Sequence, residues 1–194
     1  APSSTPASGA AKDRRLTGHL TLEGASAAAV WAWAKGRVSE ELASRVTDPA
    51  GRLSATLEVD GSLAEPRWKG QLAVDDGAVT LQGAERFTGL TVRAQAEGTG
   101  GRLRLPALVV RAPEGRLEVT GSATRARAAA SWQYELGVTA DRFPLPLEEA
   151  MLATFKADLT GAAGREQITS QLAISKLRLE RVTRPPRAAL DPHR

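Results

Sequence analysis

The chain has 194 residues, a formal net charge of +4 and no cysteine. The missing cysteine excludes disulfides, thiolate metal sites and a cysteine nucleophile. A small basic excess is typical of a solvated surface and does not indicate a nucleic-acid ligand. The longest apolar run, Ala27–Ala34, falls far short of the roughly 18 residues that a membrane-spanning helix needs.

Both ends of the chain differ in composition from the middle. Residues 1–15 are rich in proline, serine and alanine, which predicts a flexible linker. Residues 183–194 contain three prolines and no periodicity, which predicts a disordered tail. These ends suggest a piece of a longer protein, with one domain at residues 16–182.

The domain opens with a strand in which Leu20 and Leu22 alternate with polar residues. A helical segment at about 26–47 follows, with Ser26 as its N-cap and Asp48-Pro49 as its stop. Gly36 is expected to divide this segment in two. Its apolar face repeats at every fourth position: Val30, Ala34, Val38, Leu42 and Val46.

From Gly51 onward, apolar and polar residues alternate and predict strands joined by hairpins. We expect turns at Asp76-Gly77, at Gly98–Gly101 and at Glu114-Gly115. The pairings that these turns imply each place apolar residues opposite one another: Val74 and Val79, Leu72 and Leu81, Ala96 and Leu103, Ala94 and Leu105, Val110 and Val119, Ala112 and Leu117.

The odd-numbered Leu103 and Leu105 precede Pro106, and the even-numbered Leu108 and Val110 follow it. A bulge at the proline would keep all four side chains on one face. Later strands continue the alternation: Trp132 to Val138, Phe155 to Leu159, Leu172 and Ile174, and Leu177 and Leu179. The predicted fold class is therefore mainly β, an antiparallel meander with a short helical segment near its N-terminus.

Part of the pattern repeats at an offset of about 100 residues, in two strand units at about 51–82 and 153–182. Gly61 matches Gly161, and the run from Gln71 to Val74 matches the run from Gln171 to Ile174. We expect both glycines to let the backbone turn. The repeated residues carry no chemistry, so the repeat predicts additional strands and additional apolar surface.

No catalytic or metal-binding constellation is visible. His19 falls on the polar side of a strand and His193 in the tail, and neither has a ligand partner at a suitable spacing. A turn explains Asp75-Asp76, and a helix start explains Glu148-Glu149. We therefore expect no enzyme, no metal and no cofactor.

Nucleic-acid binding is not expected either, because the arginines at 125, 127, 178, 181 and 184 lack interleaved aromatic residues. Two readings of the apolar face stay open. The first is a filled β-sandwich module that binds a protein by strand addition. The second is a trough that protein does not fill, which the scarcity of aromatic plugs favours slightly.

The segment GRLSATLEVDGSLAEPRWKGQLAVDDG, residues 51–77, fits the pattern G-x-L-x-A-x-L-x-V-x-G-(S/T)-L-x-x-P-x-x-x-G-x-L-x-(V/L)-x-x-G. RLRLPALVVRAPEGRLEVTGSA, from residue 102, and LTLEGASAAAVWAW, from residue 20, fit the same style of sequence. Over residues 16–182 the chain resembles the TamB family of the translocation and assembly module, within the AsmA-like, bridge-like lipid transfer group. The membrane helix of that family is missing from this sequence, and the family's C-terminal segment is expected to be missing too.

The resemblance implies an open β-taco, an elongated jelly-roll groove in the periplasm whose parent protein is anchored in the inner membrane. It implies phospholipid transport and outer-membrane protein assembly, with acyl chains, neighbouring strand segments and an Omp85-type barrel as partners. The implied lipid-groove lining comprises Leu57, Val59, Leu72, Val74, Val79, Leu81, Leu90, Val92, Leu103, Leu105, Leu108, Val110, Leu117, Val119, Trp132, Tyr134, Leu136, Val138, Phe155, Leu159, Leu172 and Ile174.

Overall fold

The computed structural model describes residues 15–81, 86–125, 131–145, 151–163 and 168–181. Nine strands form one antiparallel sheet in which each strand pairs with its neighbours in sequence. The elements are β1 (Gly18–Ser26), α1 (Ala27–Ala34), α2 (Glu40–Arg45), β2 (Val46–Gly61), β3 (Pro66–Leu81), β4 (Arg86–Thr99), β5 (Arg102–Arg111), β6 (Arg116–Thr124), β7 (Trp132–Leu145), β8 (Met151–Ala163) and β9 (Ile168–Arg181).

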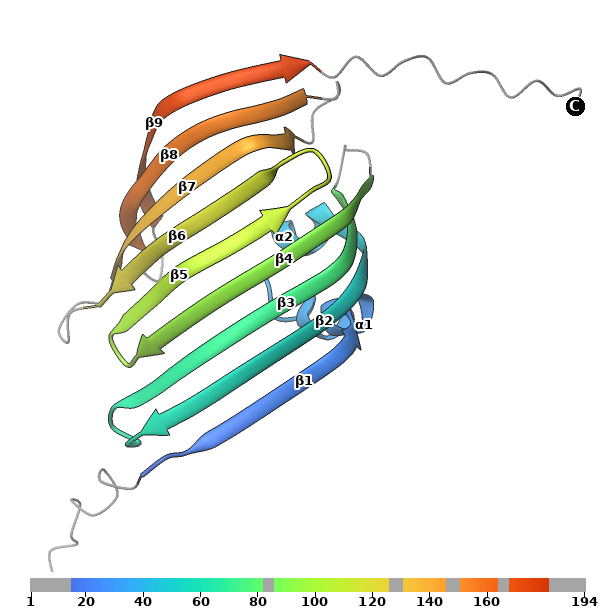
Figure 1. Ribbon diagram of the computed structural model, residues 1–194. Helices are drawn as coiled ribbons and strands as arrows, with labels where there is room; N and C mark the ends of the chain where they lie inside the picture. The colour runs from blue at the N-terminus through green and yellow to red at the C-terminus, as the bar shows by residue number, and fades with distance from the viewer. Residues whose placement is uncertain (1–14, 82–85, 126–130, 146–150, 164–167, 182–194) are drawn as a thin grey trace, which may run out of the picture.

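The sheet is open, because β1 and β9 form its two edges and do not pair with each other. Figure 1 shows a strongly bent sheet, with α1 and α2 lying behind β2–β4 where β1 ends and β2 begins. We call that side of the sheet the helical end, and the side where β1 begins the far end. The predicted antiparallel meander is therefore correct, and the described residues form a single sheet instead of a two-sheet sandwich.

Alternation along each strand gives the sheet one apolar and one polar face. Directly paired residues share a face, so the register identifies the two sets. Leu72 on the apolar face of β3, for example, lies between Ala55 of β2 and Ala94 of β4. Its neighbour Gln71 lies between Thr56 and Gln95 on the polar face.

Irregularities in the register gather toward the helical end. The pairing shifts between Leu22 and Ala25 in β1, at two places in the first half of β2, after Val74 in β3 and after Ala140 in β7. Such bulges bend a strand and increase its twist. They account for the curvature of β2–β4 near the helices in Figure 1.

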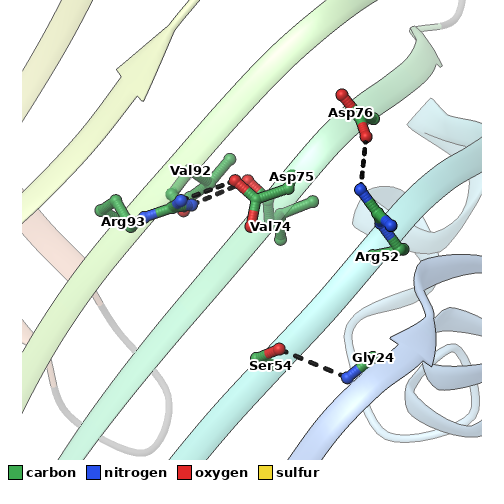
Figure 2. A network of polar contacts seen from close by, with 8 residues as sticks. All are labelled: Gly24, Arg52, Ser54, Val74, Asp75, Asp76, Val92 and Arg93. Atoms are coloured by element: carbon green, nitrogen blue, oxygen red, sulfur yellow. Dashed lines mark hydrogen bonds and ion pairs between the residues drawn. The ribbon is translucent and has the colours of Figure 1, made fainter.

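A polar network on the other face braces three of these bulges (Figure 2). The backbone N–H of Gly24 donates to the Ser54 hydroxyl at 3.3 Å. The Arg52 guanidinium pairs with Asp76 at 2.9 Å, and that of Arg93 with Asp75 at 2.6 Å. Arg93 also donates to the Val74 carbonyl at 3.1 Å, so this arginine holds both the side chain and the backbone of the β3 bulge.

The buried core is small. Within the described ranges, the buried apolar residues are two leucines and four alanines: Ala43, Leu90, Ala140, Leu152, Ala153 and Ala157. Those of the sheet, Leu152 apart, lie on its apolar face. A filled sandwich of this length would bury many large side chains in close packing, which this sheet does not do.

The predicted hairpin turn at Asp76-Gly77 is wrong, because β3 runs without interruption from Pro66 to Leu81. Asp76 does have a left-handed backbone conformation, with a φ of 52°, but the residue lies in a bulge of β3 and not in a turn. Asp-Gly suits both structures because both require a positive φ. Val74 and Leu72 therefore pair with β2 and β4, and not with Val79 and Leu81.

The other two hairpins occur where the sequence predicts them, with a register shifted by two residues. Gly98 pairs with Leu103, and Val110 pairs with Leu117. Ala96 is therefore not opposite Leu103, and Leu117 is opposite Val110 and not Ala112, so Val110 is not opposite Val119. The bulge at Pro106 adds one more residue, so Ala94 is opposite Leu108 and not Leu105. The faces are still as predicted, because two residues are one pleat period. The bulge at Pro106 is confirmed by the register shift between Leu105 and Leu108.

The helical segment is divided as expected, but it is shorter than predicted. It ends at Arg45, and Val46 already belongs to β2. Ser26 occupies the N-cap with an extended backbone, yet its side chain makes no capping hydrogen bond. Trp31 is half-buried, whereas Trp33 is 64% exposed and its ring centroid lies 4.1 Å from the Arg37 guanidinium carbon.

Gly61 and Gly161 turn out to have different roles. Gly61 has a φ of 102° and precedes the turn at residues 62–65, as predicted. Gly161 lies inside β8 opposite Tyr134, so the predicted turn there is wrong. A Cβ at Gly161 would collide with the Thr169 carbonyl oxygen and the Tyr134 ring. The glycine therefore makes room for the tyrosine.

The predicted linker and tail lie almost wholly outside the described residues.

Candidate functional site

The candidate site is the apolar face, on which the register places all 22 of the residues named as groove lining. The clearest feature is an apolar row that crosses all nine strands. We call it the first apolar row, and it runs through Leu22, Ala55, Leu72, Ala94, Leu108, Val119, Val138, Ala157 and Ile174.

A second apolar row lies beside the first, toward the helical end. It runs through Ala25, Leu53, Val74, Val92, Val110, Leu117, Ala140, Phe155 and Leu177. With neighbouring strands about 4.8 Å apart, each row extends roughly 38 Å along the curved sheet. Neither row contains a polar or charged residue, so together they form a continuous hydrocarbon surface.

The exposure of this surface rises toward the two sheet edges. Leu90 is buried, and most of the inner-strand lining residues are half-buried. At the edges, Leu20 of β1 is 64% exposed, and Leu172 and Ile174 of β9 are 63% and 53% exposed. Large exposed apolar patches on soluble proteins normally mark binding sites.

Most aromatic residues of the apolar face lie near its two ends, and the exception is Phe155 in the second apolar row. Phe87 and Phe143 are near the helical end, and Trp68, Trp132 and Tyr134 are near the far end. At the far end, the Trp68 ring covers Gly98, where an added Cβ would lie 2.7 Å from it. Tyr134 covers Gly161 in the same way, and its hydroxyl donates to the Thr169 carbonyl at 3.3 Å. The first apolar row is therefore wholly aliphatic, and the second contains one ring, that of Phe155.

The polar face carries charges whose signs alternate from strand to strand. One row runs through His19, Glu58, Lys69, Glu97 and Arg104. A shallow hollow over β2–β5 is lined by the members of this row other than His19, together with Asp60, Arg67 and Arg102. Three acids and four bases line the hollow, so most of its charges are compensated and an excess of one positive charge remains.

The residues considered for catalysis are not brought together. His19 Nδ1 lies 4.0 Å from Glu58 on the exposed polar face, and its Nε2 contacts the Thr21 hydroxyl at 2.8 Å. Asp75 and Asp76 serve the bulge through their arginine partners. His193, Glu148 and Glu149 lie outside the described residues. The residues that the structure describes contain no group of three His, Asp or Glu suited to a metal ion.

The lining named from the sequence is incomplete. Both apolar rows also contain alanines, such as Ala55 and Ala94 in the first and Ala140 in the second, and the edge strands add Leu22 and Leu177. Strand alternation alone would have identified them.

None of the helices found in the described part of the chain is long and apolar enough to cross a bilayer.

Comparisons with known proteins identify no relative of this chain. No family model, no curated protein sequence and no solved structure matches it.

Proposed function

We propose that this chain is a segment of a periplasmic groove protein that conducts phospholipids between the inner and outer membranes. In this proposal, the acyl chains lie along the two apolar rows, and the polar face remains in water. The parent protein is anchored in the inner membrane and supports outer-membrane protein assembly beside an Omp85-type barrel. The proposal also rests on the resemblance of the G-x-L segments to the TamB family.

One observation carries the proposal: two uninterrupted apolar rows cross nine strands, and no second sheet among the described residues covers them. Covering apolar surface yields about 25 cal/mol for each Å² removed from water. A surface of this length therefore favours a long hydrocarbon ligand. Because transport along it needs no catalytic group, the dispersed carboxylates and histidine are consistent with the proposal.

The test is native mass spectrometry of the purified full chain, with organic extraction to identify bound lipid. We expect phospholipid at a near-stoichiometric level. Leu105→Asp should abolish it, because Leu105 is a half-buried residue of the apolar face in the middle of the sheet. The matched control is Arg104→Asp, one residue away on the polar face, which should leave lipid occupancy unchanged.

Circular dichroism melting of both variants checks that each is folded before occupancies are compared. Should Leu105→Asp unfold, Leu105→Ser offers a milder polar change at the same position. Equal lipid occupancy in the apolar-face and polar-face variants contradicts the proposal. So does a clean lipid-free mass for the unmodified protein, which would instead indicate an interaction module.

A further inference from the structure

Strand β9 differs from the inner strands in having a long, exposed and strongly apolar edge. Five large apolar residues of this strand are 47–71% exposed: Ile168, Leu172, Ile174, Leu177 and Leu179. On one side β9 pairs with β8, and its other side pairs with no strand that the structure describes. The opposite edge, β1, is shorter, with 9 residues against 14. Unprotected edges of this kind accept further strands.

The sequence repeat makes β9 the counterpart of β3. Gln171 to Ile174 matches Gln71 to Val74, and the leucines at 72 and 172 both lie on the apolar face. The match extends into an irregularity of the backbone. β3 bulges after Val74, and β9 shifts register at the equivalent place, after Ile174. Beyond the bulge, positions 77 and 79 and their counterparts 177 and 179 return to the apolar face.

The partner of β3 therefore shows which kind of strand can pair with the free edge of β9. The edge of β3 that corresponds to the free edge of β9 is paired with β4. That pairing is antiparallel, and it places Ala94 opposite Leu72 and Val92 opposite Val74. The covered strand is half-buried at both positions, whereas Leu172 and Ile174 are exposed.

We infer that β9 is a docking edge for an extended segment of a partner polypeptide, which adds as a tenth, antiparallel strand. The segment has the chemistry of β4: small or medium apolar residues opposite Leu172 and Ile174, alternating with polar residues. Backbone hydrogen bonds supply affinity in such an addition, and alternate side chains supply specificity. The added strand extends the apolar surface by one more position in each row.

The last 13 residues of the chain are a poor occupant of this edge. They contain Pro185, Pro186 and Pro192, none of which has an N–H to donate to a strand ladder. The partner segment therefore comes from elsewhere than this tail. A second copy of the chain pairing through its own β9 is the competing occupant, and the experiment separates the two.

The probe is a fluorescently labelled synthetic peptide with the sequence of β4, residues 86–99, titrated with the full chain and followed by anisotropy. We expect saturable binding. Leu172→Asp should weaken it by at least about tenfold, the equivalent of about 1.4 kcal/mol. The matched variant Gln171→Asp changes the neighbouring residue on the polar face and should bind the peptide normally.

Two further peptides test the geometry of strand addition. Each has N-methyl groups on one alternate set of its amides, which removes the N–H groups pointing to one side only. Alternate amides of an antiparallel strand point to the same neighbour, so one peptide should lose binding and the other should keep it. Equal binding of both overturns the inference, because it indicates unspecific apolar contact.

Other results also decide the matter. Analytical ultracentrifugation that finds a dimer broken by Leu172→Asp overturns the inference in favour of a second copy. If Leu172→Asp proves unfolded by circular dichroism, Ile174→Asp replaces it. A chain stripped of lipid gives the same peptide readout, so this inference and the proposed lipid conduction fail independently of each other.

Discussion

Strands β3 and β9 have matching sequences and different surroundings. Leu72 in β3 has a paired strand on each side and is half-buried, whereas Leu172 in β9 has a strand on one side only and is 63% exposed. Both leucines lie on the same face, in strands with a bulge at the same place. Alternation therefore determines on which face a residue lies, and the neighbouring strands determine how much of its side chain is buried.

The largest contrast should come from placing a charge at the two matched leucines. Leu72→Asp is expected to lower the free energy of unfolding by at least about 2 kcal/mol, because it places a carboxylate without a partner at a half-buried position of the apolar face. Leu172→Asp should cost less than about 0.5 kcal/mol, as exposed substitutions usually do. Urea denaturation measures both, and equal losses would mean that β9 is covered in solution.

A smaller effect should follow from changing the backbone at the start of the β2–β3 pair. Gly51 has a φ of 121°, and a Cβ there would lie 2.9 Å from the Asp75 carbonyl oxygen and from the Gly77 Cα. Gly51→Ala is expected to cost about 1–3 kcal/mol through backbone strain. Gly18→Ala is the control, since no atom lies within 4 Å of its added Cβ. Thermal melts that give the two variants the same midpoint would contradict this account of the bulge.

The smallest effect should come from making the β3 bulge resemble that of β9. Asp75→Ser introduces the residue that β9 has at position 175, and it removes the 2.6 Å pair with Arg93. Both side chains are about half exposed, so the loss should be within about 0.2–1 kcal/mol. The difference from the unmodified chain should shrink in 1 M NaCl, where charges are screened within about 3 Å. Denaturation curves at low and high salt test this, and a loss that salt does not change would point to the Arg93 hydrogen bonds to backbone instead.

Much of the fold follows from sequence because its main signal has a period of two. A hairpin register that is wrong by two residues, as at Gly98–Gly101, leaves every side chain on its correct face. The candidate lining could therefore be named before the pairing was known. Pro106 was equally informative, since a proline within an alternating run requires an irregularity.

Other features could not be read from local sequence. The Asp76-Gly77 dipeptide satisfies a turn and a bulge equally well, and only the 16-residue length of β2, which needs a partner of similar length, decides between them. The openness of the sheet was also undecided, because alternation looks the same in a filled sandwich and in a trough. It depends on whether β1 and β9 meet, which is a property of the whole sheet.

Because of the bulges near the helical end, the curvature of the sheet and the composition of its apolar surface depend on different residues. Backbone irregularities at a few positions, held from the polar face by Arg52, Ser54 and Arg93, bend the strands. The side chains of the other face supply the apolar surface and take no part in those polar contacts, since Arg93 reaches only the backbone carbonyls of Val74 and Val92. Leucine, valine and isoleucine can therefore replace one another along the rows during evolution. Such exchanges change the shape of the apolar surface and leave the curvature of the sheet unchanged.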